Sequence, residues 1–274
     1  MQNSPIGVFD SGLGGLTAVK EILKIMPNED VIYFGDTGRV PYGNKSVDTI
    51  LNYALQDISF LTSMNVKFIV IACGTVSSVI QCKSNLISTP FTGVLAPTCA
   101  AAANATKNNK IGVIGTTATI NSNSYKKNLQ LLNPSVEVFQ QDCPLFVPII
   151  ENGYILPQDN LVKETVKNHL AGLKQHGIDT LILGCTHYPI ISEAIQNFMG
   201  ENVTLIDSGK ETARYLKNTL EKLDLLTNRN TKGDCKFFVS DCTENFSRTA
   251  SLFLGQNISS NVKKIDVSQY SVVR

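Results

Sequence analysis

The chain has 274 residues, of which 43% are apolar and 17% are charged, so it has room for about two domains with buried cores. Its formal net charge is +1, and the charges form no basic block that would favour nucleic acid as a partner. No apolar run approaches the roughly 20 residues of a membrane helix, and the first ten residues lack the pattern of a signal peptide, so we expect a cytoplasmic protein without a membrane segment.

Strand-like runs alternate with helix-like runs along the whole chain. Short segments rich in Val, Ile and Leu predict strands at 6–10, 30–36, 67–73, 110–116, 180–185 and 203–207. After the first of them, apolar residues repeat at helical spacing from Leu16 to Met26, and Pro27 ends the run. Further helices are expected at 47–63, 160–175 and 210–223. This alternation predicts an α/β fold with mainly parallel sheets covered by helices.

The first strand ends in the glycine-rich stretch "DSGLGG" (10–15), with a helix directly after it. Its glycines permit a tight turn, and the free N–H groups of the helix suit an anion. The stretch is not a dinucleotide fingerprint, because Thr17 occupies the place of the third small residue. A plain turn explains the glycines, but Asp10 and Ser11 at the strand tip are candidate site residues.

The next loop, "GDTGRVPYG" (35–43), is dense in turn-forming residues. It is either a surface loop or a clamp over a ligand. In the second case Asp36 and Tyr42 point inward, and backbone amides near Gly43 are available to a substrate.

Two pairs of segments in the chain echo each other. "FIVIACGTVSS" (68–78) and "LILGCTHYPI" (181–190) are both an apolar strand followed by a cysteine, while "VFDSG" (8–12) and "LIDSG" (205–209) share Asp-Ser-Gly. Two such pairs favour two related lobes, each presenting one cysteine, Cys73 or Cys185, at the carboxyl edge of its sheet. Ligands bind outside such edges.

The two cysteines predict a particular kind of chemistry. A thiol at a helix N-terminus has its pKa lowered from about 8.5, and His187 or a carboxylate is a candidate proton partner. Two thiols facing one pocket can remove a proton from one face of a carbon and deliver one to the other face. A nucleophilic mechanism leaves the second thiol without a task, and for either cysteine alone simple packing is the alternative.

Other candidate residues follow the later strands. Threonines in "GTTATINSNSY" (115–125) either bind a carboxylate or cap a helix, and Glu151 is either a site residue or solvated surface. His169 and His176 are expected at the surface. An odd number of cysteines and the absence of a C-x-x-C pair argue against a disulfide framework or a structural zinc site, and five cysteines are interpreted as packing: Cys82, Cys99, Cys143, Cys235 and Cys242.

Taken in order, these motifs resemble those of the glutamate racemases, in the cofactor-independent aspartate/glutamate racemase superfamily. The similarity runs through "DSGLGG", "YFGDTGRVPYG", "IACGTVSS", "IGTTATINSNSY", "CPLFVPIIENG" and "GCTHYP" to "FFVSDCTENFSRTASLFLG" (237–255). It implies two pseudo-symmetric α/β lobes, formed by residues 1–98 plus 208–274 and by residues 99–207, with the active site in the cleft between them. It also implies interconversion of L- and D-glutamate for peptidoglycan synthesis without a cofactor or metal, and it suggests a homodimer.

The resemblance assigns roles by position. Cys73 and Cys185 match the two catalytic acid/bases, Asp10 and His187 match the groups that assist them, and two further carboxylates are matched by Asp36 and Glu151. Residues matching substrate contacts are Ser11, Tyr42, Gly43, Gly74, Thr75, Thr116, Thr119 and Thr186.

Two positions depart from the family pattern. Gly74 stands where the family commonly has Asn, so a backbone N–H or water replaces the amide or the substrate preference has changed. Asn152 replaces the second residue of a frequent Glu-Glu pair, which leaves Glu151 as the carboxylate candidate there. Two alternatives stay open: a racemase of another acidic amino acid such as aspartate, and a non-catalytic amino-acid-binding regulator, for which both cysteines would be superfluous.

Overall fold

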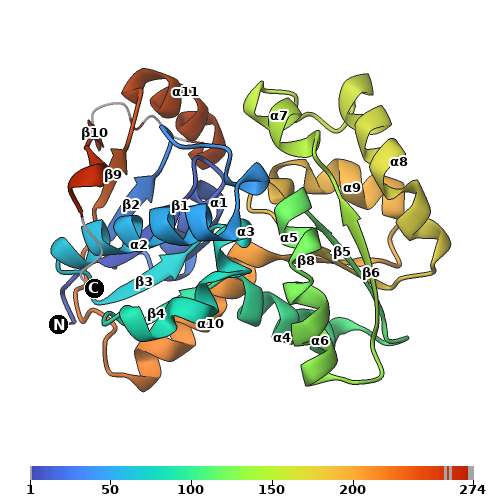
Figure 1. Cartoon of the computed structure of the whole chain (residues 1–274), viewed down its shortest axis with the longest axis horizontal. Coiled ribbons are helices and arrows are strands. Elements are labelled where there is room, and N and C mark those ends of the chain that lie inside the picture. Colours follow the sequence, from blue (N-terminus) through green and yellow to red (C-terminus); the bar gives the residue numbers. More distant parts are fainter. Residues whose placement is uncertain (1, 256–257, 259–260, 271–274) are drawn as a thin grey trace.

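The computed structural model describes residues 2–255, 258 and 261–270, which form two α/β lobes lying side by side (Figure 1). In the first lobe a six-stranded sheet has the order β10-β9-β2-β1-β3-β4, and in the second a four-stranded sheet has the order β6-β5-β7-β8. Every registered pair of neighbouring strands is parallel. The predicted fold class is therefore confirmed.

The elements have the following bounds. The strands are β1 Ile6–Asp10, β2 Val31–Gly35, β3 Phe68–Ile71, β4 Phe91–Gly93, β5 Lys110–Gly115, β6 Glu137–Asp142, β7 Thr180–Leu183, β8 Thr204–Asp207, β9 Cys235–Val239 and β10 Val262–Lys264. The α-helices are α1 Leu16–Ile25, α2 Val47–Ser63, α3 Gly74–Ser77, α4 Leu95–Ala105, α5 Thr117–Asn121, α6 Ser124–Leu132, α7 Phe146–Glu151, α8 Asn160–Gln175, α9 Ser192–Met199, α10 Ser208–Lys222 and α11 Thr243–Leu254. Short 3₁₀ helices are η1 Tyr42–Asn44, η2 Ile80–Leu86, η3 Tyr188–Ile191 and η5 Val267–Gln269.

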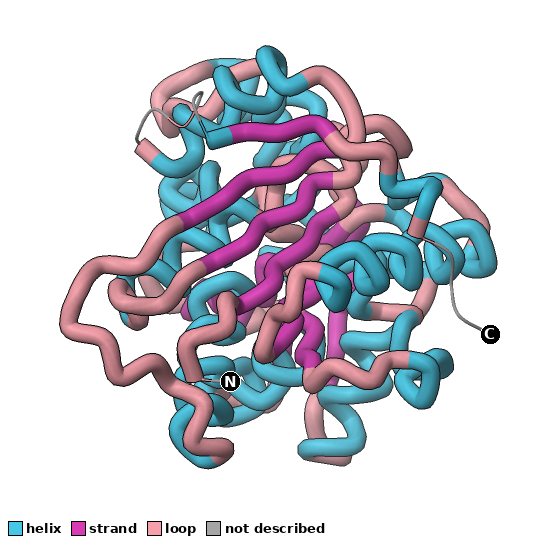
Figure 2. The backbone as a smooth tube through the Cα atoms, turned by 90° about the vertical axis from the view of Figure 1, so that its left-hand side faces the viewer, coloured by secondary structure: helices cyan, strands magenta, loops and turns pink. Residues whose placement is uncertain are grey.

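The larger sheet is buried on both faces, as the apolar strands predict. Successive side chains of a strand point to opposite faces, so Ile6 and Val8 of β1 join the core that includes α1, while Phe9 joins the core that includes α2. Figure 2 shows the strands of this sheet side by side with helices around them. Among the described helices, none is long and apolar enough to cross a membrane.

The central strands of the two sheets share one topology. In the order β2-β1-β3-β4, the chain leaves β1 toward β2 and leaves β3 toward β4, in the opposite direction. The order β6-β5-β7-β8 repeats this arrangement around β5 and β7. Such reversals open a crevice beyond the carboxyl ends of the two central strands. Cys73 and Cys185 follow the equivalent strands β3 and β7, so the echo between their segments corresponds to a structural equivalence.

The second echo has no such equivalence. Asp10 ends the central strand β1, whereas Asp207 ends the edge strand β8, the counterpart of β4. The Asp207 carboxylate caps α10, accepting a hydrogen bond from the backbone N–H of Lys210 at 3.0 Å. The shared Asp-Ser-Gly therefore reflects similar local turns and not a repeated position in the two lobes.

The chain passes between the lobes twice. Strands of the larger sheet come from residues 6–93 and 235–264, and strands of the smaller sheet come from residues 110–207. We propose domain boundaries near residues 98/99, within α4, and 207/208, between β8 and α10; neither interrupts a strand. The polar edge strand β6 and the short strand β4 went unpredicted because neither has the apolar run of a central strand.

Candidate active site

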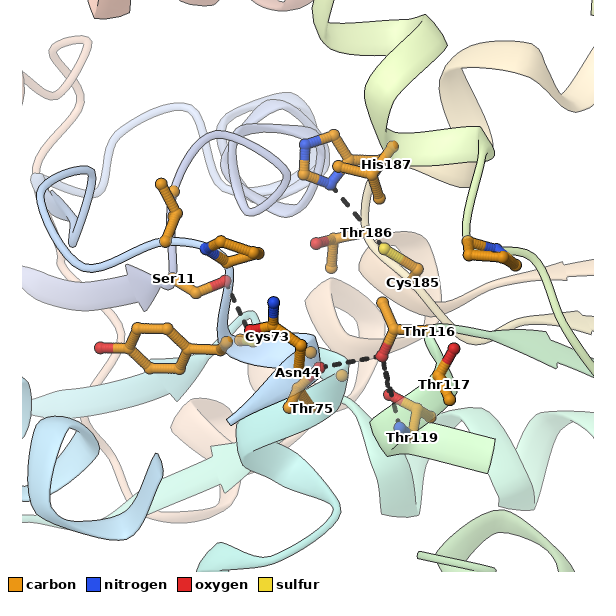
Figure 3. A pocket seen from close by; sticks show the side chains of 18 of the residues that line it. Ser11, Asn44, Cys73, Thr75, Thr116, Thr117, Thr119, Cys185, Thr186 and His187 are labelled. Atoms are coloured by element: carbon orange, nitrogen blue, oxygen red, sulfur yellow. Dashed lines mark hydrogen bonds between the residues drawn. The ribbon is translucent and has the colours of Figure 1, made fainter. Parts of the chain in front are cut away.

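A cavity of about 530 Å³ lies where the carboxyl ends of the two sheets face each other. Figure 3 shows Ser11, Cys73 and Thr75 of the first lobe across from Thr116, Thr119 and Cys185 of the second. Both sulfurs belong to this one cavity, although Cys73 is only 4% exposed and Cys185 only 8%. A volume of this size suits a small molecule, since ligand pockets span about 300–1,000 Å³.

Nearly all of the residues predicted from the sequence line this cavity. They are Asp10, Ser11, Tyr42, Gly43, Cys73, Gly74, Thr75, Thr116, Thr119, Glu151, Cys185, Thr186 and His187. Their roles toward a substrate remain predictions, but the fold gathers them from segments that are far apart in the sequence.

Asp36 lies elsewhere, and the expectation that it points inward is wrong. It is fully buried inside the first lobe, where it accepts hydrogen bonds from Arg39 Nε at 2.6 Å, from Ser240 Oγ at 2.7 Å and from the Tyr42 hydroxyl. The Tyr42 hydroxyl also lies 3.2 Å from Asp57. The Asp36 carboxylate is thus held by Arg39, Ser240 and Tyr42 outside the cavity. Of these partners Tyr42 lines the cavity, so Asp36 supports the cavity wall indirectly.

Cys73 has an acidic neighbourhood. Its sulfur lies 3.4 Å from Ser11 Oγ, and burial together with the negative charge of Asp10 raises the pKa of the thiol to about 12. The predicted lowering by a helix N-terminus is therefore wrong at this site. The helix after Cys73, α3, spans only four residues, and its small dipole does not offset the loss of water around the sulfur.

Asp10 is the carboxylate beside that thiol. It is 2% exposed, and its Oδ2 accepts a hydrogen bond from the backbone N–H of Gly12 at 2.9 Å. Burial raises the pKa of Asp10, while the positive charge of His187 and the Gly12 hydrogen bond act to lower it. The glycines of "DSGLGG" have a steric role here: a Cβ on Gly15 would lie 2.6 Å from Asp10 Cβ.

Cys185 has a basic neighbourhood instead. A turn and the 3₁₀ helix η3 follow it, and His187 Nδ1 lies 3.8 Å from its sulfur. The other ring nitrogen, Nε2, lies 3.0 Å from Glu151 Oε1. Burial opposes a charge on His187, but these two contacts outweigh it and raise the pKa of His187 to about 10. The imidazole is thus cationic at neutral pH, and its Nδ1 faces the Cys185 sulfur.

A row of hydroxyls joins the two lobes on one side of the cavity. Thr75 Oγ1 lies 3.1 Å from Thr116 Oγ1, which lies 3.0 Å from Thr119 Oγ1 (Figure 3). Thr116 also caps α5 through the backbone N–H of Thr119, at 3.3 Å. Thr116 is therefore a helix cap that also lines the cavity, and the binding of a carboxylate by these threonines stays a prediction.

Comparisons with known proteins decide the family. Residues 26–216 match the model of the Asp/Glu/hydantoin racemase family. The chain belongs to this family. A glutamate racemase of Geobacter metallireducens is 46% identical over 252 residues, covering 91% of this chain and 92% of the relative. A glutamate racemase of Thermoanaerobacter pseudethanolicus is 46% identical over 270 residues, covering 98% of this chain and all of the relative.

Solved structures agree with this membership. The glutamate racemase of Francisella tularensis in complex with D-glutamate is 38% identical and superposes with a TM-score of 0.91, covering 98% of this chain and 100% of that one. A glutamate racemase from Bacillus anthracis is 37% identical with a TM-score of 0.92, covering 97% and 98% of the two chains. The resemblance inferred from the motifs is confirmed.

Some wall residues of this racemase were missed or misinterpreted. Cys143, interpreted as packing, is 1% exposed but lines the cavity, and burial raises the pKa of its thiol. Further lining residues are apolar ones near Tyr42 and Glu151, whose position in the sequence could have found them: Val40, Pro41, Pro144, Val147 and Pro148. The remaining ones are Gly12, Asn44, Thr117, Asn152 and Gly184. His176 is exposed as predicted, whereas His169 is half-buried against Phe146, with ring centroids 5.4 Å apart.

The described residues were also considered as ligands for a metal. In that part of the chain, no three His, Cys, Asp or Glu side chains gather closely enough to hold an ion. All seven cysteines carry free thiols.

Proposed function

We propose that this chain interconverts L- and D-glutamate by moving a proton at Cα between two thiols, without a cofactor. The observation that carries the proposal is that Cys73 and Cys185, from equivalent strands of two lobes, line one cavity. The names of the relatives support glutamate as substrate, and one similar structure, from Francisella tularensis, holds D-glutamate.

In the proposed mechanism one sulfur is a base and the other is an acid. A thiolate on one side removes the Cα proton, and the neutral thiol on the other side gives its proton to the opposite face of the carbanion. The net result is inversion with both thiols exchanged in protonation state. The raised pKa of Cys73, next to Asp10, makes it the neutral thiol at rest, and the cationic His187 lies beside Cys185 as its proton partner.

The carbanion needs strong stabilisation, because a carbon acid is far weaker than a thiol of pKa about 8.5. We assign the α-carboxylate of the substrate to the hydroxyl row of Thr75, Thr116 and Thr119, where preorganised donors face the cavity. Ser11, Gly43 and Thr186 complete the proposed set of substrate contacts. By the family resemblance, the product serves peptidoglycan synthesis in the cytoplasm, and the chain acts as a homodimer.

Aspartate is the alternative substrate, because Gly74 lacks the side-chain amide that the family commonly has at this position. Incubation with L-glutamate and with L-aspartate in deuterated water, followed by NMR of the Cα–H signal, separates the candidates. Exchange and inversion of glutamate are expected. Exchange of aspartate alone would replace the proposed substrate, and no exchange of either would favour the non-catalytic binder and overturn the enzyme.

A further inference from the structure

The two cysteine-bearing turns touch each other through their glycines. A Cβ built on Gly74 would lie 2.4 Å from the backbone oxygen of Gly184, in the other lobe. Non-bonded heavy atoms prefer separations of about 3.5–4.0 Å, so any side chain at position 74 would have to displace that oxygen by about 1 Å. The position of a Cβ atom at residue 74, where the family commonly has Asn, is thus blocked by the main chain of Gly184 in the opposite lobe.

Moving either turn would break hydrogen bonds that hold it to its own lobe. The N–H of Gly184 donates to Ile114 O at 2.8 Å, which ties the turn to β5. On the other side, Gly74 O accepts from the N–H of Ser78 at 3.1 Å and from its hydroxyl at 2.8 Å. Both contact atoms belong to backbone fixed within its own lobe, so a larger residue at position 74 would act by separating the lobes.

The contact lies next to the chemistry. Gly74 follows Cys73 and Gly184 precedes Cys185, so the separation of these two glycines limits the separation of the two sulfurs. Two hydrogen bonds also join the lobes: Thr17 Oγ1 donates to Thr186 O at 2.7 Å, and Ser124 Oγ donates to Ser78 O at 2.7 Å. We call this contact region between the lobes the seam.

We propose that Gly74 is a positioning residue: in this chain its close contact with Gly184 sets how far the two lobes close, and so sets the distance between the two thiols. The proposal rests on the two-thiol function above. It reinterprets the departure from the family pattern: Gly74 acts through lobe spacing and not through a lost substrate contact.

The main test compares Gly74→Ala and Gly74→Asn with the wild type, and Gly172→Ala serves as the matched control. Gly172 is an exposed glycine of α8 with open space around its Cβ position. Both position-74 variants are expected to lose about 10²-fold in kcat, the usual effect of a 1 Å misplacement. Alkylation of Cys73 and Cys185 by iodoacetamide, followed by mass spectrometry, should become several-fold faster because the seam is wider. The control should change neither quantity.

A second pair of variants keeps the test informative if Gly74→Ala does not fold. Thr17→Val removes the hydrogen bond to Thr186 O, and Thr17→Ser retains it; the former should speed alkylation and lower kcat, and the latter should restore both. Wild-type kcat and alkylation in the position-74 variants, or higher glutamate turnover in Gly74→Asn, would overturn the proposal. Alkylation is measured without substrate, so it tests lobe spacing even if glutamate proves not to be the substrate.

Discussion

The two thiols occupy equivalent places in two lobes but unlike electrostatic surroundings. Cys73 follows β3 beside the buried carboxylate of Asp10, which helps to raise the pKa of the thiol to about 12. Cys185 follows β7 beside His187, whose own pKa is raised to about 10 by Cys185 and Glu151 against the effect of burial. A shared topology thus delivers two sulfurs to one cavity, while the residues around the two sulfurs differ in charge.

This difference shows how a nearly symmetric scaffold can place unlike charges beside two equivalent thiols. The proposed proton transfer across a carbon needs one sulfur that accepts and one that donates. The carboxylate of Asp10 beside Cys73 and the imidazole of His187 beside Cys185 give the two sides unlike proton partners. The variants below test whether the two sides are as unlike as their neighbours indicate.

The largest expected effect comes from removing either sulfur. Cys73→Ala and Cys185→Ala should each lower racemisation by about 10⁴-fold, at the upper end of general acid–base contributions. Each variant should still exchange the Cα proton of one enantiomer in deuterated water, and the two variants should prefer opposite enantiomers. Cys82→Ala, at an exposed thiol, is the control. Full activity in either single variant would rule out the two-base scheme.

A smaller effect is expected from the neighbours of the sulfurs. Asp10→Asn and His187→Asn each remove a charged or hydrogen-bonding partner, which should lower kcat by about 10- to 100-fold. Because enantiomers have equal free energy, kcat/KM must fall equally in both directions. The asymmetry is therefore sought in kcat, which His187→Asn should lower more in one direction and Asp10→Asn more in the other. Equal losses of kcat in both directions for both variants would contradict the assignment.

The smallest effect concerns Glu151, whose side chain is 39% exposed and lies 3.0 Å from His187. Because the pKa of His187 rises from 6.5 to about 10 on folding, its stabilisation is complete below pH 6.5 and is lost as the pH rises through 10. Glu151→Gln should move this loss to lower pH and reduce kcat several-fold. Urea unfolding across this pH range measures the shift, with the exposed Glu221→Gln as control. An unchanged pH profile would mean that Glu151 does not support the His187 charge.

Much of the fold could be predicted from the sequence, because central parallel strands are short apolar runs. The strand at 6–10 and the helices at 47–63 and 160–175 match β1, α2 and α8 at both ends. Edge strands such as β6, with the sequence EVFQQD, are not found by this criterion. An edge strand has no neighbouring strand on one side, so it can be more polar. Pairing between distant segments, such as β9 beside β2, leaves no local signal.

The site could be predicted as a set of residues but not as an electrostatic arrangement. Motif order was enough to collect much of the cavity lining, and two echoed segments were enough to pair Cys73 with Cys185. The direction of the Cys73 pKa shift was beyond reach, because it depends on burial and on the nearness of Asp10 in space. The position of Asp36 was mispredicted for a similar reason: its partner Ser240 lies 204 residues away in the sequence.

The position of β9 in the larger sheet has a consequence for how the protein is made. Residues 235–239 pair with β2, so the sheet of the first lobe is finished only by residues that leave the ribosome after all strands of the second lobe. Until then the backbone of β2 is an open edge, able to pair with a neighbouring chain. A stop between residues 187 and 235 would therefore leave every cavity residue present and yet yield an aggregation-prone product.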